Sequence, residues 1–283
     1  MEPRTTRRRV RWTHILGIIL LFNGMSAAAT LPIERQFPAP GDWAEGMTFV
    51  GADLWIWDID LPGFYVVAPD TGAVKASYPS PPTGGATGLA YDGTFVWGAS
   101  GDSEYPPFMA KFSPIDGSVI SYYDVPIRNP EGITYDGQYL WVSGNTFDDS
   151  RIVALDPLTM QPVRELILPV QSPRDLAWDG MSLWMGASDW LGLGMGWREH
   201  ILQIDPLTGD VLGDFDVPGG VAIGLAWDHG LLYVSDLTRD TIFVLRVPEP
   251  ASIALLCAAA ALLKLGPVRR EARRVSLLKE QVQ

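Results

Sequence analysis

Cysteine and histidine are scarce in this chain of 283 residues. The one cysteine, Cys257, lies in an apolar stretch near the C-terminus, and there are only three histidines. A disulfide within the chain needs two cysteines, and a thiolate metal site needs several. Both are therefore excluded. The long central part of the chain, about 220 residues, is large enough to be stable through a hydrophobic core alone.

Basic residues are also scarce, except at the two ends. Of the 21 Lys and Arg residues, 11 lie in residues 1–29 and 251–283, whereas only three of the 33 Asp and Glu residues do. The segment 30–250 thus carries 10 basic and 30 acidic residues, a net charge near −20. Such a polyanion repels nucleic acid, so we expect no nucleic-acid partner. Cations, basic protein surfaces and neutral polysaccharides are compatible with this charge.

The N-terminus has the three parts of a secretory signal peptide. Five arginines lie among residues 4–11, an apolar run spans 15–22, and three alanines occupy 27–29. This order predicts an exported protein whose signal peptide, residues 1–29, is removed after Ala29. Thr6-Arg7-Arg8 also resembles part of a twin-arginine signal, so the export route stays open.

The C-terminal segment 248–283 combines a proline motif, an apolar run and a basic end. The motif, with its preceding residue, is Val247, Pro248, Glu249 and Pro250. An Ala/Leu-rich run over 251–266 follows, and then Arg269, Arg270, Arg273 and Arg274. As a helix the run spans roughly 24 Å, slightly less than a hydrocarbon core of ~30 Å. It suits a marginal membrane anchor with its arginines on the cytoplasmic side. A buried C-terminal helix of the globular domain is the alternative.

This tail resembles the PEP-CTERM sorting signal of Gram-negative bacteria. In that family a Pro-Glu-Pro motif precedes a membrane helix and a basic stop, and a membrane-embedded exosortase is thought to remove the tail. The resemblance implies export, a membrane anchor before processing, and then a place at the cell surface or in the extracellular matrix. The implied partners are the export machinery and an exosortase.

The middle of the chain is a repeat. Five similar segments begin at Gly46, Gly88, Gly132, Asp175 and Gly224 and end at Trp55, Trp97, Trp141, Trp184 and Tyr233. The aromatic ends are 42, 44, 43 and 49 residues apart. Each repeat contains four short apolar stretches separated by turns, such as the Asp-Pro-Leu-Thr-Gly turn at 205–209. This period predicts an all-β fold, a five-bladed β-propeller over 30–247 with four strands in each blade. We interpret the recurring aromatic residues as packing between blades.

The last repeat lacks its fourth strand, because residues 241–247 run directly into the proline motif. A matching segment exists at the start of the domain, where 34–40 resembles the fourth strand of the first repeat at 75–81. We therefore expect the N-terminal strand to complete the last blade and close the ring, which removes two exposed sheet edges.

Residues that precede the inner strands should line one mouth of the central channel. They are Glu45, Thr87, Glu131, Arg174 and Ile223. Among them, Glu45, Glu131 and Arg174 are the candidate catalytic residues, since two carboxylates and a guanidinium can bind a polar ligand or transfer protons. Bonds to backbone amides or to each other would be a structural alternative.

The longest loop, 188–199, is rich in glycine and carries Trp190, Trp197 and Arg198, with His200 directly after it. These four residues are candidates for ligand binding, because exposed tryptophans suit stacking on sugar rings or contact with an apolar partner. Packing over the channel mouth is an equal alternative.

Acidic residues in the same group of loops are weak candidates for calcium, the one cofactor that the sequence suggests. They are Asp58, Asp102, Asp148, Asp189 and Asp236. Calcium takes six to eight oxygen ligands, which several loops could supply, but none has EF-hand spacing. Solvated acidic loops are the simpler interpretation.

The Gly-Leu-Ala-Trp-Asp-Gly…Leu-Trp pattern is similar to repeats of NHL-type propellers, glutamine cyclotransferases and virginiamycin B lyases. The resemblance implies the propeller fold and does not specify an activity. A nucleophile elbow, zinc-ligand spacing and a phosphate loop are absent from the sequence. We therefore expect a binding or structural module for polysaccharide or protein. A lyase-like or cyclotransferase-like enzyme with a site at the channel mouth is the alternative.

Overall fold

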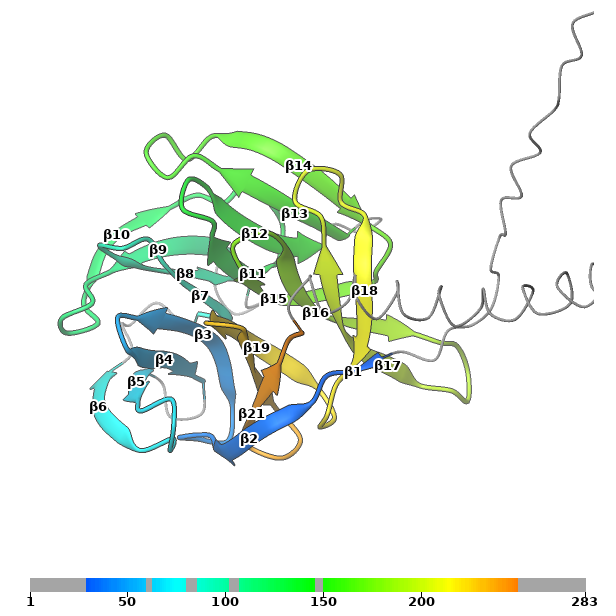
Figure 1. Cartoon of the computed structure of the whole chain (residues 1–283). Coiled ribbons are helices and arrows are strands. Elements are labelled where there is room, and N and C mark those ends of the chain that lie inside the picture. The colour runs from blue at the N-terminus through cyan, green and yellow to red at the C-terminus, as the bar shows by residue number, and fades with distance from the viewer. Residues whose placement is uncertain (1–28, 60–62, 80–85, 102–106, 146–149, 249–283) are drawn as a thin grey trace, which may run out of the picture.

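The computed structural model describes residues 29–59, 63–79, 86–101, 107–145 and 150–248, which form five β-sheets around a central channel (Figure 1). Regular structure in these ranges is entirely β, and they include no helix that could cross a membrane. The predicted signal peptide (apart from Ala29) and the tail from Glu249 onward, with Arg269 and Arg270, lie outside the described residues.

Four-stranded sheets follow one another along the chain as blades. Blade 1 consists of β3 (Ala44–Val50), β4 (Asp53–Asp58), β5 (Gly63–Val67) and β6 (Val74–Pro79). Blade 2 consists of β7 (Gly88–Tyr91), β8 (Val96–Ser100), β9 (Phe108–Phe112) and β10 (Val119–Tyr123). Blade 3 consists of β11 (Pro130–Tyr135), β12 (Leu140–Asn145), β13 (Ser150–Leu155) and β14 (Pro162–Leu168). Blade 4 consists of β15 (Ser172–Trp178), β16 (Leu183–Trp190), β17 (Trp197–Ile204) and β18 (Val211–Asp216). Blade 5 consists of β19 (Ala222–Asp228), β20 (Leu231–Asp236), β21 (Thr241–Arg246) and β2 (Ile33–Pro38).

The first strand of each repeat is the inner strand of its blade. These strands (β3, β7, β11, β15 and β19) pack side by side around the channel, and β19 packs against β3 to close the ring. The predicted five-bladed propeller with four-stranded blades is therefore confirmed.

Ring closure follows the predicted route. Strand β2, from the start of the domain, pairs antiparallel with β21, with Phe37 opposite Ile242. A two-residue strand that the sequence did not predict, β1 (Ala29–Thr30), adds to blade 4 by pairing parallel with β18. Ala29, the last residue of the predicted signal peptide, thus lies opposite Phe215.

The repeated Asp-Gly and Trp residues form one structural unit in blades 2, 3 and 4. The indole Nε1 of each Trp donates to the Asp five residues earlier, at 2.7, 2.7 and 2.8 Å. These pairs are Asp92 with Trp97, Asp136 with Trp141, and Asp179 with Trp184. The following glycines have φ of 92°, 97° and 97°, which disfavours a side chain. The recurring Trp residues pack in the clusters between sheets, as interpreted from the sequence.

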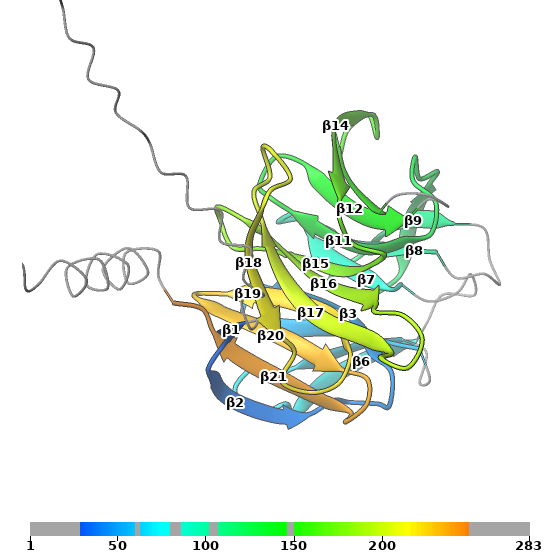
Figure 2. The same ribbon diagram turned by 90° about the vertical axis from the view of Figure 1, so that its right-hand side faces the viewer.

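The molecule has two distinct faces. We call the side with the turns between first and second strands the turn face, and the opposite side the loop face. Val247 N donates to Gly230 O at 3.0 Å, so the described chain ends on the turn face. Figure 2 shows the end of β21 on one side of the molecule and the connection between β16 and β17 on the other.

Candidate functional site

Glu131 and Arg174 are neighbouring ionisable residues at the loop-face end of the channel. They lie on the adjacent inner strands β11 and β15. Burial raises the pKa of the Glu131 carboxyl to about 7, although the nearby Arg174 charge acts to lower it. A carboxyl with this pKa populates both protonation states at neutral pH, as a proton-transfer group requires.

One nitrogen of the Arg174 side chain donates a hydrogen bond, and another has no acceptor in the described part of the chain. Its Nη2 donates to Ser188 Oγ at 3.5 Å, and Ser188 Oγ donates to Glu199 Oε2 at 2.6 Å. Its Nε is buried and has no hydrogen-bond acceptor among the described residues. This N–H can donate to an oxygen atom of a bound ligand or of an ordered water.

The other predicted mouth residues make contacts within their own blade or to the next one. Glu45, on β3, accepts a hydrogen bond from Trp43 Nε1 at 2.9 Å. Thr87 Oγ1 is within bonding distance of the Ala99 and Pro130 carbonyls, at 3.0 and 3.3 Å, and Ile223 is buried. The structure therefore places Glu131 and Arg174 on the adjacent blades 3 and 4, close enough for an electrostatic interaction, whereas Glu45 lies on blade 1.

Asp175 occupies the channel axis directly after Arg174. Its Oδ2 accepts backbone N–H bonds from Leu225 at 2.8 Å and Met47 at 3.5 Å, and its Oδ1 accepts from Leu176 at 2.8 Å. One carboxylate thus joins β3, β15 and β19. Burial raises the pKa of Asp175 well above its ordinary value, against the lowering effect of these backbone donors.

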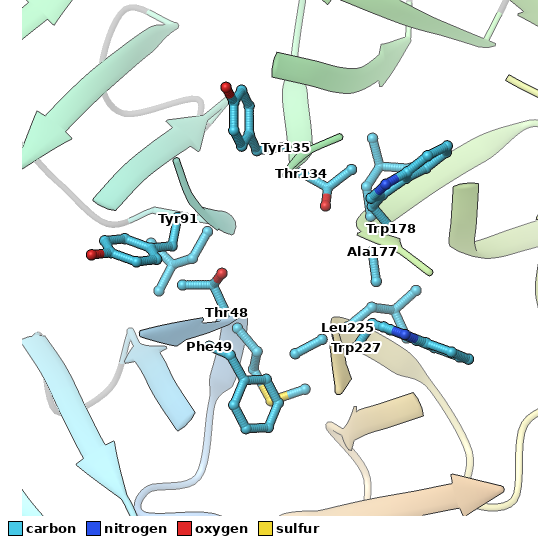
Figure 3. A pocket seen from close by; sticks show the side chains of 13 residues that line it. Thr48, Phe49, Tyr91, Thr134, Tyr135, Ala177, Trp178, Leu225 and Trp227 are labelled. Atoms are coloured by element: carbon cyan, nitrogen blue, oxygen red, sulfur yellow. The ribbon is translucent and has the colours of Figure 1, made fainter. Parts of the chain in front are cut away.

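The turn-face side of the channel is a small cavity of about 150 Å³ (Figure 3). Equivalent positions of the inner strands line it, and the rings of Tyr91, Tyr135, Trp178 and Trp227 point away from the hollow. Drug-sized ligands occupy pockets of about 300–1,000 Å³. The cavity therefore suits water or a small ion, and we do not place the main site there.

The predicted loop between the second and third strands of blade 4 is a long hairpin. Strands β16 and β17 pair as far as Trp190 opposite Trp197, so the connecting loop itself is only 191–196. We call residues 190–197 the hairpin tip. The two indole rings are 5.4 Å apart, and Trp190 and Trp197 are 42% and 56% exposed. Leu191, Leu193 and Met195 are exposed beside them.

The base of the hairpin is fixed by polar contacts. Arg198 binds Asp214 through both terminal nitrogens, at 3.0 and 2.8 Å. His200 is buried between Asp214, at 3.1 Å from Nδ1, and Asp189, at 3.3 Å from Nε2. Of the four predicted ligand-binding residues, the structure leaves the two tryptophans exposed and engages Arg198 and His200 in this network.

The described calcium candidates bind backbone amides. Asp58 Oδ2 accepts from Trp43 N at 3.3 Å, Asp189 Oδ1 from Gln171 N at 2.8 Å, and Asp236 Oδ2 from Val221 N at 3.2 Å. In each of these three blades this bond ties the end of the second strand to the loop that enters the inner strand. Within the described part of the chain, no three His, Cys, Asp or Glu side chains are grouped to hold a metal. Asp102 and Asp148 lie outside it.

No family model and no curated protein sequence matches this chain. Among solved structures, it is similar to the glutaminyl cyclase of Myxococcus xanthus, with a TM-score of 0.59 and 17% identity over 77% of this chain and 96% of that one. It is also similar to the PQQ-bound aldose sugar dehydrogenase of Streptomyces coelicolor, with a TM-score of 0.50 and 16% identity over 77% of this chain and 98% of that one. At these identities the likeness supports the propeller fold and assigns no activity.

Proposed function

We propose that this protein is an exported propeller that binds a polysaccharide or a protein through its hairpin tip, at the cell surface or in the extracellular matrix. The observation that carries the proposal is the tip itself. Five large apolar side chains are exposed on one projecting hairpin, and no charged residue lies between Trp190 and Trp197. Contiguous exposed apolar surface of this kind is typical of binding sites.

The two ends of the chain support export and an orientation of the propeller relative to the membrane. The N-terminal segment has the layout of a signal peptide, and the tail resembles the PEP-CTERM signal, with exosortase as its processing partner. The described chain ends at Pro248 on the turn face, opposite the hairpin tip. A propeller held to a membrane by its tail would therefore present the tip outward, toward matrix or neighbouring proteins.

Two double variants test the tip and separate the ligand classes. A sugar would stack on the indoles, whereas a protein would also cover the aliphatic side chains. Trp190→Ala with Trp197→Ala should weaken binding of either ligand at least about tenfold, since buried aromatic anchors dominate interface energies. Leu193→Ser with Met195→Ser should weaken only protein binding. Binding is measured on a glycan array and against matrix protein of the producing cells.

Leu158→Ser is the matched control, because Leu158 is 92% exposed on blade 3, away from the hairpin. Its binding should equal that of the unchanged protein. If the double tryptophan variant binds every ligand of the unchanged protein at full strength, the tip is not the binding surface.

A second candidate function is catalysis at the channel mouth, favoured by the Glu131–Arg174 pair. A largely shielded carboxyl with a pKa of about 7 beside an arginine can act as a general acid or base. One of the solved proteins with this fold is a glutaminyl cyclase. Cyclisation of peptides that begin with glutamine is therefore the reaction to test first.

Glu131→Gln separates catalysis from binding. For an enzyme, we expect turnover to fall by about 10²–10⁴-fold with ligand binding retained, and the rate profile of the unchanged protein to show a pKa near 7. Glu165→Gln, on the outer strand β14 of the same blade and away from the channel mouth, serves as the control for a general loss of charge. Absence of turnover on glutaminyl peptides and on a glycan panel would leave the binding role.

A further inference from the structure

An apolar groove lies between blades 4 and 5 on the turn face. Its volume is about 390 Å³, and its aromatic lining includes Trp184, Phe215 and Trp227. The Trp184 and Trp227 rings are stacked with centroids 6.1 Å apart, and Figure 3 shows Trp227 pointing away from the channel. Met181 and Leu212 also belong to the lining and are 70% and 57% exposed. We call this the blade 4–5 groove.

Several polar groups of the groove are already bonded to one another. Trp184 Nε1 donates to Asp179 Oδ2 at 2.8 Å, and Gln203 Nε2 donates to Ser182 Oγ at 3.1 Å. The groove therefore offers an occupant mainly apolar surface. Its size lies in the range of pockets that bind small ligands or side chains.

The described chain ends at the wall of this groove. Val247 and Pro248 form part of its wall, and the next residues are Glu249, Pro250 and the apolar run 251–266. Ile253 is only five residues beyond Pro248, and five extended residues span about 17 Å, enough to fold back over the groove. A segment tethered at the rim has a high effective concentration there.

We propose that the blade 4–5 groove binds the beginning of the chain's own apolar tail, residues 251–257, whenever that tail is outside a membrane. In water, the groove then covers the apolar side chains of the tail. When a bilayer is present, the tail leaves the groove and enters the lipid. Removal of the tail leaves the groove open. This inference does not depend on the ligand of the hairpin tip.

The single native cysteine makes the inference testable in the full-length chain. Cys257 lies in the proposed occupant, so one added cysteine on the groove can report contact by a disulfide or a short bis-maleimide link. Met181→Cys should cross-link to Cys257 within one chain in detergent-free buffer. Leu212→Cys provides a second position in the lining. Liposomes of phosphatidylethanolamine and phosphatidylglycerol should abolish both links.

Ile115→Cys is the matched control, because Ile115 is 82% exposed in a turn of blade 2. We expect about tenfold less cross-linking from this position, since the tail is held at the groove. Equal yields from 115 and 181 would overturn the inference, as would no link from either groove position. A cross-linked dimer would assign the groove to the tail of a second copy and would also overturn it.

Discussion

At the scale of single residues, Asp175 is the side chain on which we expect the ring to depend most. Its carboxylate is the acceptor for amides of three inner strands. Asp175→Asn keeps the size but replaces one oxygen by an amide nitrogen, which cannot accept a backbone N–H, whereas both oxygens of a carboxyl group can, protonated or not. A buried donor left without an acceptor costs about 1–3 kcal/mol. We expect a loss of that order in the free energy of unfolding, measured by urea denaturation.

The pH dependence of that loss reports on the Asp175 carboxyl. Its pKa is raised well above the ordinary value by burial, so the folded state holds this proton more tightly than the unfolded state. The resulting stability is present at acid pH and is lost as pH rises through the folded pKa. The difference between wild type and Asp175→Asn should therefore shrink from pH 4 upward. A difference that grew with pH would mean that the backbone donors hold the carboxylate ionised.

The role of Asp175 shows which features of a single residue can be predicted from the sequence. The aligned repeats already contain the signal, because Asp175 stands where the other four repeats have glycine. Its hydrogen-bond partners cannot be predicted from the repeat, since Met47 and Leu225 are 128 and 50 residues away in the sequence. Glycine at the equivalent positions leaves room: a Cβ on Gly88 or Gly132 would collide with neighbouring inner strands and with Asp175.

At the scale of strands, the regular part of the fold follows from local pattern. The Asp-Gly turn and the Trp five residues after the Asp are bonded to each other, so the spacing alone predicts the hairpin. Departures from the repeat were less predictable. β16 and β17 extend to the two tryptophans because cross-strand pairing continues past the blade, and β1 forms through a partner in another blade. The blade 4–5 groove likewise depends on how two blades meet.

At the scale of the whole molecule, closure of the ring depends on β2, which joins the two ends of the domain and also contacts blade 1. Phe37 is 5% exposed and packs against Gly72 so closely that a Cβ there would not fit. Arg35 Nη2 donates to the Tyr233 hydroxyl at 2.6 Å, and its Nε to Pro69 O at 3.3 Å. A short N-terminal strand thus holds the last blade against the first.

Phe37→Ala should therefore destabilise the entire propeller, even though it lies only a few residues from the start of the domain. Removal of a buried phenylalanine costs about 3–5 kcal/mol. Ile33→Ala is the control in the same strand, because Ile33 is 49% exposed and surface changes usually stay within about 0.5 kcal/mol. Urea unfolding followed by tryptophan fluorescence and by circular dichroism should give one shared transition, at lower urea for Phe37→Ala. An unchanged transition would mean that β2 detaches locally and that the other strands keep the ring closed without it.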